Sequence, residues 1–251
     1  MTYDCFAKYY DVLTGNIDYR KRASYFDRLI KKYKRTDNDI LLDLCCGTGS
    51  LSEEFSKLGY DVIAVDRSPE MLDLAIEKKF EKDLPIQYLC QDARDLDMFG
   101  TIGITVCALD SINHLDSLAD VKKVFERVSL FAEPGGIFIF DMNSVYKHSS
   151  VLKNNCFVYE TEEVYCVWQN EYTGGEEHKV DISLDFFEPS EKGGYTRSSE
   201  YFSERAYSIE SIIRVLEEVG LEPLAVFEGD TENSPADDSE RIVFVAGKSA
   251  F

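Results

Sequence analysis

Apolar residues recur at two different spacings along the first 143 residues. Short, nearly continuous apolar runs are typical of buried strands, and apolar residues that recur every three or four positions are typical of helices. The pattern predicts strands at 39–45, 61–66, 86–91, 104–109 and 136–140, and helices at 5–14, 18–35 and 118–131, with two more beginning near Ser50 and Ser68. Because strands and helices alternate, we expect an α/β fold in which a doubly wound, mostly parallel sheet carries helices on both faces.

The pattern changes at residue 144, where helical spacing stops. Apolar and polar residues alternate at 180–186, as on a half-buried antiparallel strand, and turn residues gather at 173–175 and 189–194. We therefore expect three or four antiparallel strands within 144–203. Aromatic residues make up 11 of these 60 positions against 21 of the other 191. Sheet packing and a wall over a ligand pocket both account for this enrichment.

The last segment, 204–251, returns to a mixed pattern. Ser208 is a suitable cap for a helix that Gly220 ends, and strands are expected at 224–227 and 241–246. We assign 1–143 and 204–251 to one core domain and 144–203 to an inserted antiparallel lid subdomain. Because the insert follows the fifth strand, it should lie over the carboxyl edge of the sheet and select the substrate.

Acidic residues stand at the ends of the predicted strands. The first strand contains Asp43 and leads into the turn Gly47-Thr48-Gly49, and the second ends at Asp66. Glycines without a Cβ let a ligand approach the backbone, and the helix that begins near Ser50 directs free N–H groups to the same place. Since parallel strands bring their carboxyl ends together, Asp66 should lie beside the turn and accept the hydroxyls of a ribose.

These motifs resemble those of the class I S-adenosylmethionine (SAM)-dependent methyltransferases. Residues 43–49 are similar to the family's acidic, glycine-rich motif, and Asp66 to its ribose-binding acid. Residues 91–93 and 134–136 resemble the adenine-binding segment and the turn before the fifth strand. The departure is Cys45, which replaces the first glycine of the motif. The resemblance also implies that the last two strands form an antiparallel hairpin, which completes a seven-stranded Rossmann-like sheet.

The resemblance implies a SAM site at the strand ends. Asp43 and the Gly47 turn would hold the methionine end, Asp66 the ribose, and Asp92 with Ala93 the adenine; Asp92 could instead be a loop cap. The full set of expected cofactor-binding residues is Tyr10, Tyr19, Asp43, Cys45, Gly47, Gly49, Asp66, Arg67, Met71, Asp92, Ala93 and Leu109. For Tyr10 and Tyr19, simple helix packing is an equally good interpretation.

The segment after the fourth strand carries the candidates for the substrate side. In the family that the chain resembles, this segment lies between cofactor and acceptor, so Asp110, Asn113 and His114 are candidate catalytic residues. His114 could accept a proton from an amine or hydroxyl, because an ordinary imidazole titrates near pH 6.5. A structural histidine is the alternative. The segment lacks the Pro-Pro-aromatic sequence of resembling nucleic-acid and protein-amide N-methyltransferases, which weakens those substrate classes.

The composition and net charge limit the kinds of ligand and partner that we expect the protein to bind. A net charge of −20 opposes binding to phosphate backbones, so we expect no nucleic acid partner. No apolar run approaches the roughly 18 residues that cross a bilayer, and the N-terminal residues do not resemble a signal peptide. The seven cysteines include no C-x-x-C pair and suit a reducing cytoplasm. Adjacent Cys45 and Cys46 cannot easily chelate one ion, so no metal is expected.

Three functions remain open from the sequence. The first is a SAM-dependent methyltransferase that acts on a nitrogen or oxygen of a small molecule, and the second is a non-catalytic SAM-binding or interaction protein. The third, an NAD-type oxidoreductase, is disfavoured because the turn lacks the G-x-G-x-x-G spacing. The sequence gives no indication of oligomeric state.

Overall fold

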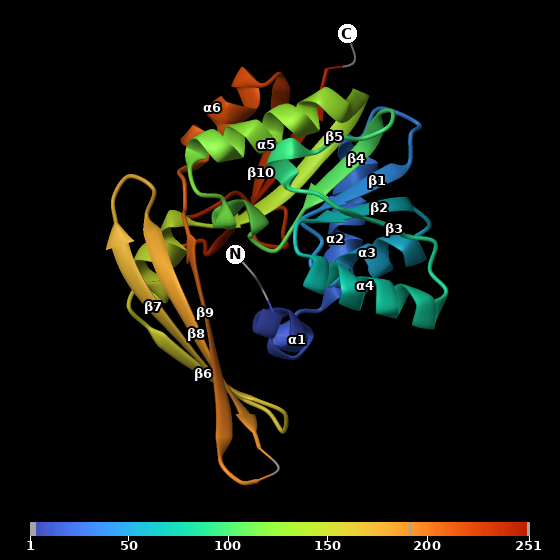
Figure 1. Cartoon of the computed structure of the whole chain (residues 1–251). Coiled ribbons are helices and arrows are strands. Elements are labelled where there is room, and N and C mark those ends of the chain that lie inside the picture. Colours follow the sequence, from blue (N-terminus) through green and yellow to red (C-terminus); the bar gives the residue numbers. More distant parts are fainter. Residues whose placement is uncertain (1–3, 191, 250–251) are drawn as a thin grey trace.

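The computed structural model describes residues 4–190 and 192–249, which form two sheets (Figure 1). The larger sheet has seven strands in the order β10-β11-β5-β4-β1-β2-β3. Its strands are β1 (Ile40–Leu44), β2 (Asp61–Asp66), β3 (Gln87–Cys90), β4 (Ile102–Cys107), β5 (Ala132–Asn143), β10 (Leu221–Glu228) and β11 (Arg241–Lys248). Strands β1 to β5 pair in parallel, and β11 pairs antiparallel with both β5 and β10. The predicted fold class is confirmed.

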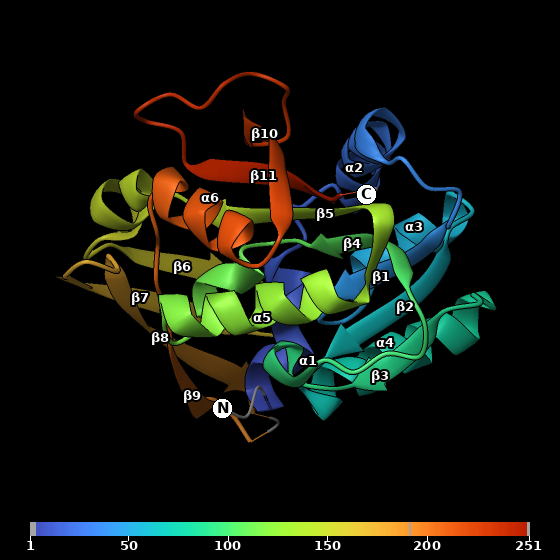
Figure 2. The same cartoon turned by 90° about the horizontal axis from the view of Figure 1, so that it is seen from above.

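Helices cover both faces of this sheet (Figure 2). One face carries α2 (Tyr19–Tyr33), α3 (Ser50–Lys57) and α4 (Pro69–Lys82), and the other carries α5 (Leu118–Phe131) and α6 (Ile209–Glu218). Ser68 caps α4 through a hydrogen bond from the Met71 amide, as its sequence predicts. No helix among the described residues is long and apolar enough to cross a bilayer.

Two strand boundaries differ from the prediction and change the site. Strand β4 ends at Cys107, not at 109, so Leu109 and Asp110 belong to the loop that follows. Strand β5 covers Ala132–Asn143, not 136–140. Its C-terminal part, from Ile137 to Asn143, is paired with β11, and this pairing continues the strand beyond residue 140. The longer strand brings Asp141 and Asn143 to the carboxyl edge of the sheet.

The inserted segment forms a second, four-stranded antiparallel sheet. Its strands are β6 (Cys156–Glu160), β7 (Tyr165–Gly174), β8 (Lys179–Pro189) and β9 (Tyr195–Glu204), which follow one another in space. Their number and antiparallel pairing agree with the prediction of three or four antiparallel strands. One face packs its own apolar cluster, in which alternate residues of β8 such as Leu184 and Phe186 are fully buried. The prediction that this segment contains no helix was wrong: Lys147–Leu152 forms a short π-helix, η3.

Helix α1 (Asp4–Leu13) lies between the two sheets (Figure 1). Tyr9 stacks on Phe186 of β8 with ring centroids 5.8 Å apart. On the opposite side, the Asp11 carboxylate accepts hydrogen bonds from the Thr48 hydroxyl at 2.6 Å and from Lys78 Nζ at 2.8 Å. The helix therefore joins the lid sheet to the glycine turn of the core.

Candidate functional site

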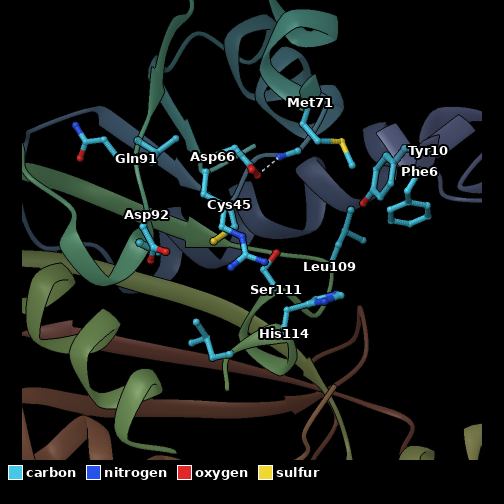
Figure 3. Close-up of a pocket in the computed structure, with 15 residues that line it drawn as sticks. Phe6, Tyr10, Cys45, Asp66, Met71, Gln91, Asp92, Leu109, Ser111 and His114 are labelled. Carbon is cyan, nitrogen blue, oxygen red and sulfur yellow. Dashed lines mark hydrogen bonds between the residues drawn. The ribbon is translucent and has the colours of Figure 1, made fainter. Parts of the chain in front are cut away.

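A cavity of about 800 Å³, part of it open to solvent, lies at the carboxyl ends of β1, β2, β3 and β4. Gln91 and Asp92 line one end, Phe6 and Tyr10 line the other, and Cys45 and Asp66 lie between them (Figure 3). The position agrees with the rule that open α/β sheets bind ligands beyond the carboxyl ends of their strands.

The glycine turn forms the floor of the cavity. Cys45, Gly47 and Gly49 have φ angles of 62°, 54° and 73°, all in the left-handed region. No atom lies within 4 Å of the position that a Cβ would occupy at Gly47, which lines the cavity. At Gly49 a Cβ would instead collide with the Tyr88 hydroxyl. Gly47 therefore leaves room for a ligand, whereas Gly49 is required by packing and does not line the cavity.

Asp66 fastens the turn to the end of β2. Its carboxylate accepts hydrogen bonds from the Gly47 amide at 2.8 Å and the Ser68 amide at 2.9 Å. Burial raises the pKa of this carboxyl above its usual range, although both amides oppose the shift. Each oxygen retains a further lone pair, so the carboxylate can still accept hydroxyl donors from a ligand in the cavity.

Asp43 lies beneath the turn and not in the cavity wall. Its side chain is 2% exposed and accepts a hydrogen bond from the Ser52 hydroxyl of α3. Burial raises the pKa of Asp43 to about 7, with the Ser52 hydrogen bond opposing the rise. Asp43 therefore supports the turn from behind, and its contact with the methionine end of the cofactor stays a prediction.

Asp92 lines the opposite end of the cavity with its carboxylate engaged by Arg94. Arg94 Nε lies 2.9 Å from Oδ1, and its terminal nitrogen lies 2.7 Å from Oδ2. The Arg94 hydrogen bond is the largest cause of a pKa below the usual range. Asp92 also accepts from the Arg94 amide and caps a short 3-10 helix, so the loop-cap role that the sequence left open is present. Ala93 and Gln91 line the wall beside it.

The loop after β4 has an unusual backbone that Asp141 holds in place. Leu109 and Asp110 both have positive φ angles, 59° and 55°, which are costly for residues with a Cβ. Their amides donate to the two oxygens of the fully buried Asp141 carboxylate at 3.1 and 2.8 Å. Arg22 of α2 and Arg241 of β11 compensate the charge of Asp141.

Asp110 and Asn113 do not line the cavity, contrary to the prediction. The Asp110 carboxylate pairs with Arg241 at 2.6 Å and accepts from Asn143. The Asn113 amide is fully buried and bonded to the backbone of Asn143 and Arg205. In this structure their polar atoms are occupied by other groups of the protein.

His114 does line the cavity, on the short 3-10 helix η2 (Ser111–His114). Its ring stands 5.2 Å from that of Phe202 in the lid sheet. Its Nδ1 is buried and has no hydrogen-bond partner among the described residues, and its Nε2 lies 3.7 Å from the Glu204 carboxylate.

The N-terminal tyrosines separate into different roles. Tyr10 lines the cavity, and burial raises the pKa of its phenol well above the usual value. Tyr19 does not line it; its hydroxyl donates to Thr14 at 3.1 Å. Phe6 packs edge-on against Tyr10 with ring centroids 5.3 Å apart.

Ten of the expected site residues line the cavity, namely Tyr10, Cys45, Gly47, Asp66, Arg67, Met71, Asp92, Ala93, Leu109 and His114. Five others lie behind the wall: Tyr19, Asp43, Gly49, Asp110 and Asn113. The cavity also includes Phe6, Val65, Gln91, Ser111 and Leu115, which the prediction did not place there. Except for Phe6, these additional residues lie within or next to the strand ends and loop segments that the sequence analysis had recognised. Extending each of those segments by one or two residues would have included them.

One group of potential cation ligands occurs among the described residues. Oxygen and nitrogen atoms of Asp110, His114 and Glu204 lie within 4.8 Å of one another. The guanidinium of Arg241 already pairs with Asp110, so a positive charge is present at this group. The arrangement therefore favours a role in hydrogen bonding over a cation site.

Comparison with known proteins agrees with this geometry. A family model described as "Methyltransferase domain" matches residues 41–136. A protein of Geobacillus sp. (strain WCH70), named a putative methyltransferase, is 31% identical over 248 residues, which are 99% of this chain and 100% of that protein. A crystal structure of a S-adenosylmethionine-dependent methyltransferase from Clostridium acetobutylicum ATCC 824 has a TM-score of 0.85 and 33% identity, and covers 96% of both chains. A sugar N-methyltransferase from Streptoalloteichus sp ATCC 53650 shares the fold at a TM-score of 0.77 and 20% identity, with 96% of this chain and 92% of that chain covered.

Proposed function

Because this chain belongs to the SAM-dependent methyltransferase family, we propose that it methylates a nitrogen or oxygen atom of a small-molecule acceptor. The observation that carries the proposal is the difference between the two ends of the cavity. One end is formed by the polar residues Gln91 and Asp92, the other by Phe6, Tyr10 and His114 beside the lid sheet, and Asp66 lies between them. Such a cavity suits a cofactor at one end and an acceptor at the other.

The lining residues fit SAM. Gly47 leaves an open approach to the backbone, and Asp66 has lone pairs available for ribose hydroxyls. Met71 and Ala93 supply apolar contact for the adenine, and Asp92 and Gln91 supply polar atoms at its edge. The nearby carboxylates also favour a ligand that carries a sulfonium and an ammonium group. SAM supplies an activated methyl group that an attacking lone pair can take without further activation.

The contribution of the protein to methyl transfer is orientation and exclusion of water. Holding two reactants in line can lower a barrier by roughly 7–11 kcal/mol. Phe6 and Tyr10 of α1 close the cavity at the end nearest the lid, and Phe202 of β9 packs against both Phe6 and His114. We assign the antiparallel sheet of 144–203 to the acceptor side, where it would determine which small molecule enters.

His114 is the residue best suited to receive a proton from the acceptor. Its ring lines the cavity, and its Nδ1 has no partner among the described residues. A base in this position contributes when the acceptor is a protonated amine or a hydroxyl.

Calorimetric titration of SAM into Asp66→Ala tests the cofactor site. We expect at least about a tenfold increase in Kd, or about 1.4 kcal/mol, because the ribose hydroxyls lose a charged acceptor. Asp61→Ala removes an exposed carboxylate from the start of the same strand and should leave the Kd unchanged. Equal affinities of both variants and the unaltered protein would remove Asp66 from the site.

The acceptor class is tested separately by following release of the demethylated cofactor. A panel of small amines, amino sugars and hydroxylated metabolites should contain a compound that accelerates this release. Acceleration by RNA or by a protein, with none by small molecules, would refute the assignment of acceptor class.

A further inference from the structure

All three histidines of the chain are connected at the junction of core and lid. Glu204, at the end of β9, is 3% exposed. Its Oε1 lies 3.7 Å from His114 Nε2, and its Oε2 lies 3.4 Å from Nε2 of the fully buried His148 on η3. His148 Nδ1 in turn lies 2.8 Å from the backbone carbonyl oxygen of His178. The carboxylate therefore stands between one histidine that lines the cavity and one that is inaccessible.

The hydrogen bonds determine where the protons of this group lie. A carbonyl oxygen only accepts, so His148 Nδ1 must carry a hydrogen. His148 Nε2 forms no hydrogen bond with a described residue and faces Glu204 Oε2 across 3.4 Å. Asn143 Nδ2 donates to the same Glu204 oxygen at 3.1 Å and so helps to fix the position of the carboxyl group. Glu204 Oε1 then remains available as an acceptor for His114 Nε2–H.

The backbone keeps Glu204 and His114 in register. Their chain neighbours, Arg205 and Asn113, form two hydrogen bonds: the Arg205 amide donates to the Asn113 carbonyl at 2.8 Å, and Asn113 Nδ2 donates to the Arg205 carbonyl at 2.7 Å. The Asn143 amide also donates to Asn113 Oδ1 at 2.8 Å. This connection between η2 and β9 is independent of the charges of Glu204 and His114.

We propose that Glu204, supported by His148 and Asn143, is a positioning residue for His114. The proposal rests on the function proposed above. The carboxylate would accept Nε2–H and so leave Nδ1, which has no protein partner, as the basic nitrogen. The separation of 3.7 Å is slightly longer than a hydrogen bond, and such contacts commonly shorten when substrate binds.

In the proposed reaction, the proton of the acceptor would pass to His114 Nδ1, which is closed to solvent in this structure, so the ring would have to shift when the acceptor binds. SAM would supply the methyl group and leave as its neutral thioether, and the positive charge would end on the imidazolium. Glu204 stabilises that charge, as a carboxylate behind a catalytic histidine does in other enzymes.

Other charged groups near this cluster are already paired. Arg241 compensates Asp110, Lys147 Nζ donates to Asn143 Oδ1 at 3.0 Å, and Arg205 pairs with Glu177 at 3.0 Å. Asp116 lies 3.7 Å from Arg205 on the same side of the junction. Glu204 is thus the carboxylate that the structure brings to His114 Nε2.

Long-range ¹H–¹⁵N spectra of the intact, ¹⁵N-labelled protein test the proposal without an acceptor. Three histidines give a simple spectrum, in which His114 should carry its proton on Nε2 and His148 should be protonated on Nδ1. In Glu204→Gln, the preference of His114 for Nε2–H should disappear. A His114 already protonated on Nδ1 alone in the unaltered protein would overturn the proposal, whether or not an acceptor is ever found.

Steady-state kinetics supply the second readout. Glu204→Gln should lower kcat about 10- to 100-fold while the Kd for SAM changes less than about twofold.

Two variants keep the kinetic test decisive. Glu177→Gln is the matched control, since it removes a carboxylate that pairs with Arg205 at the same junction; its kcat and its Kd for SAM should not change. His148→Asn can still donate to the His178 carbonyl and should reproduce part of the loss if Glu204→Gln does not fold. Equal losses in the Glu177 and Glu204 variants, or activity that EDTA abolishes in the unaltered protein, would refute the proposal.

Discussion

Asp43 provides a stability test whose sign and size follow from its burial. The carboxyl lies beneath the glycine turn with a pKa raised to about 7, against about 3.9 in an unfolded chain. Between these two pH values the folded state holds a proton that the unfolded state has released. Folding stability therefore falls as pH rises, by about 1.4 kcal/mol per unit, and the total over about three units is about 4 kcal/mol.

Replacement with asparagine removes this titration and keeps the shape of the side chain. We expect the stability of Asp43→Asn minus that of the unaltered protein to be constant below pH 4, to rise between pH 4 and 7, and to level off above pH 7. Any pH-independent free-energy cost of placing the amide beside Ser52 shifts the whole difference curve without changing its slope. Other titrating groups are common to both proteins and cancel.

Urea unfolding at half-unit intervals from pH 4 to 8, followed by circular dichroism, measures this difference. The slopes with urea should match between the two proteins, so that the midpoints report stability. A difference curve that is flat or that falls with pH would show that Asp43 is ionised in the folded protein at pH 5. That result would refute the argument that burial outweighs the Ser52 hydrogen bond.

Two further substitutions test packing near the site, both measured by urea unfolding. Gly49→Ala should lower the free energy of unfolding by at least about 1 kcal/mol, because φ is 73° and the new methyl group collides with the Tyr88 hydroxyl. Adding Tyr88→Phe should restore part of the lost stability. If it restores none, the collision is not the cause. Asp141→Asn should lower the free energy of unfolding by about 3–5 kcal/mol, because Arg22 and Arg241 lose their shared buried counter-charge. A loss below about 1 kcal/mol would show that these ion pairs do not hold the loop after β4 in place.

The parts of the fold that the sequence predicted are those with a strong local signal. The apolar spacing of 118–131 predicted α5 at its observed bounds, and the acids at the ends of β1 and β2 located the cavity. Helix η3 was missed because Lys147-His148-Ser149-Ser150 has no apolar periodicity, and its helical form depends on packing against β7 and β8. Local pattern carries no information about such tertiary contacts.

The positions of the polar side chains within the site could be assigned only from the folded structure. The sequence grouped Asp110, Asn113 and His114 because they are neighbours in the chain, yet only His114 lines the cavity. Glu204 is 90 residues from His114 along the chain, and it ends a strand, β9, that the sequence pattern did not locate individually. Asp141 followed the same rule as Asp43 and Asp66, an acid after an apolar strand, and a strict application of that rule would have found it.

The network around Asp141 also bears on how the protein is made. Synthesis proceeds from the N-terminus, and the central strands β1, β2 and β4 are present long before Arg241 is translated. Until then, Asp141 has Arg22 but lacks Arg241 as a counter-charge, and Asp110 lacks the arginine with which it pairs in the folded protein. We therefore expect the loop that carries Leu109 and His114 to become fully fixed only after β11 has paired with β5, late in synthesis.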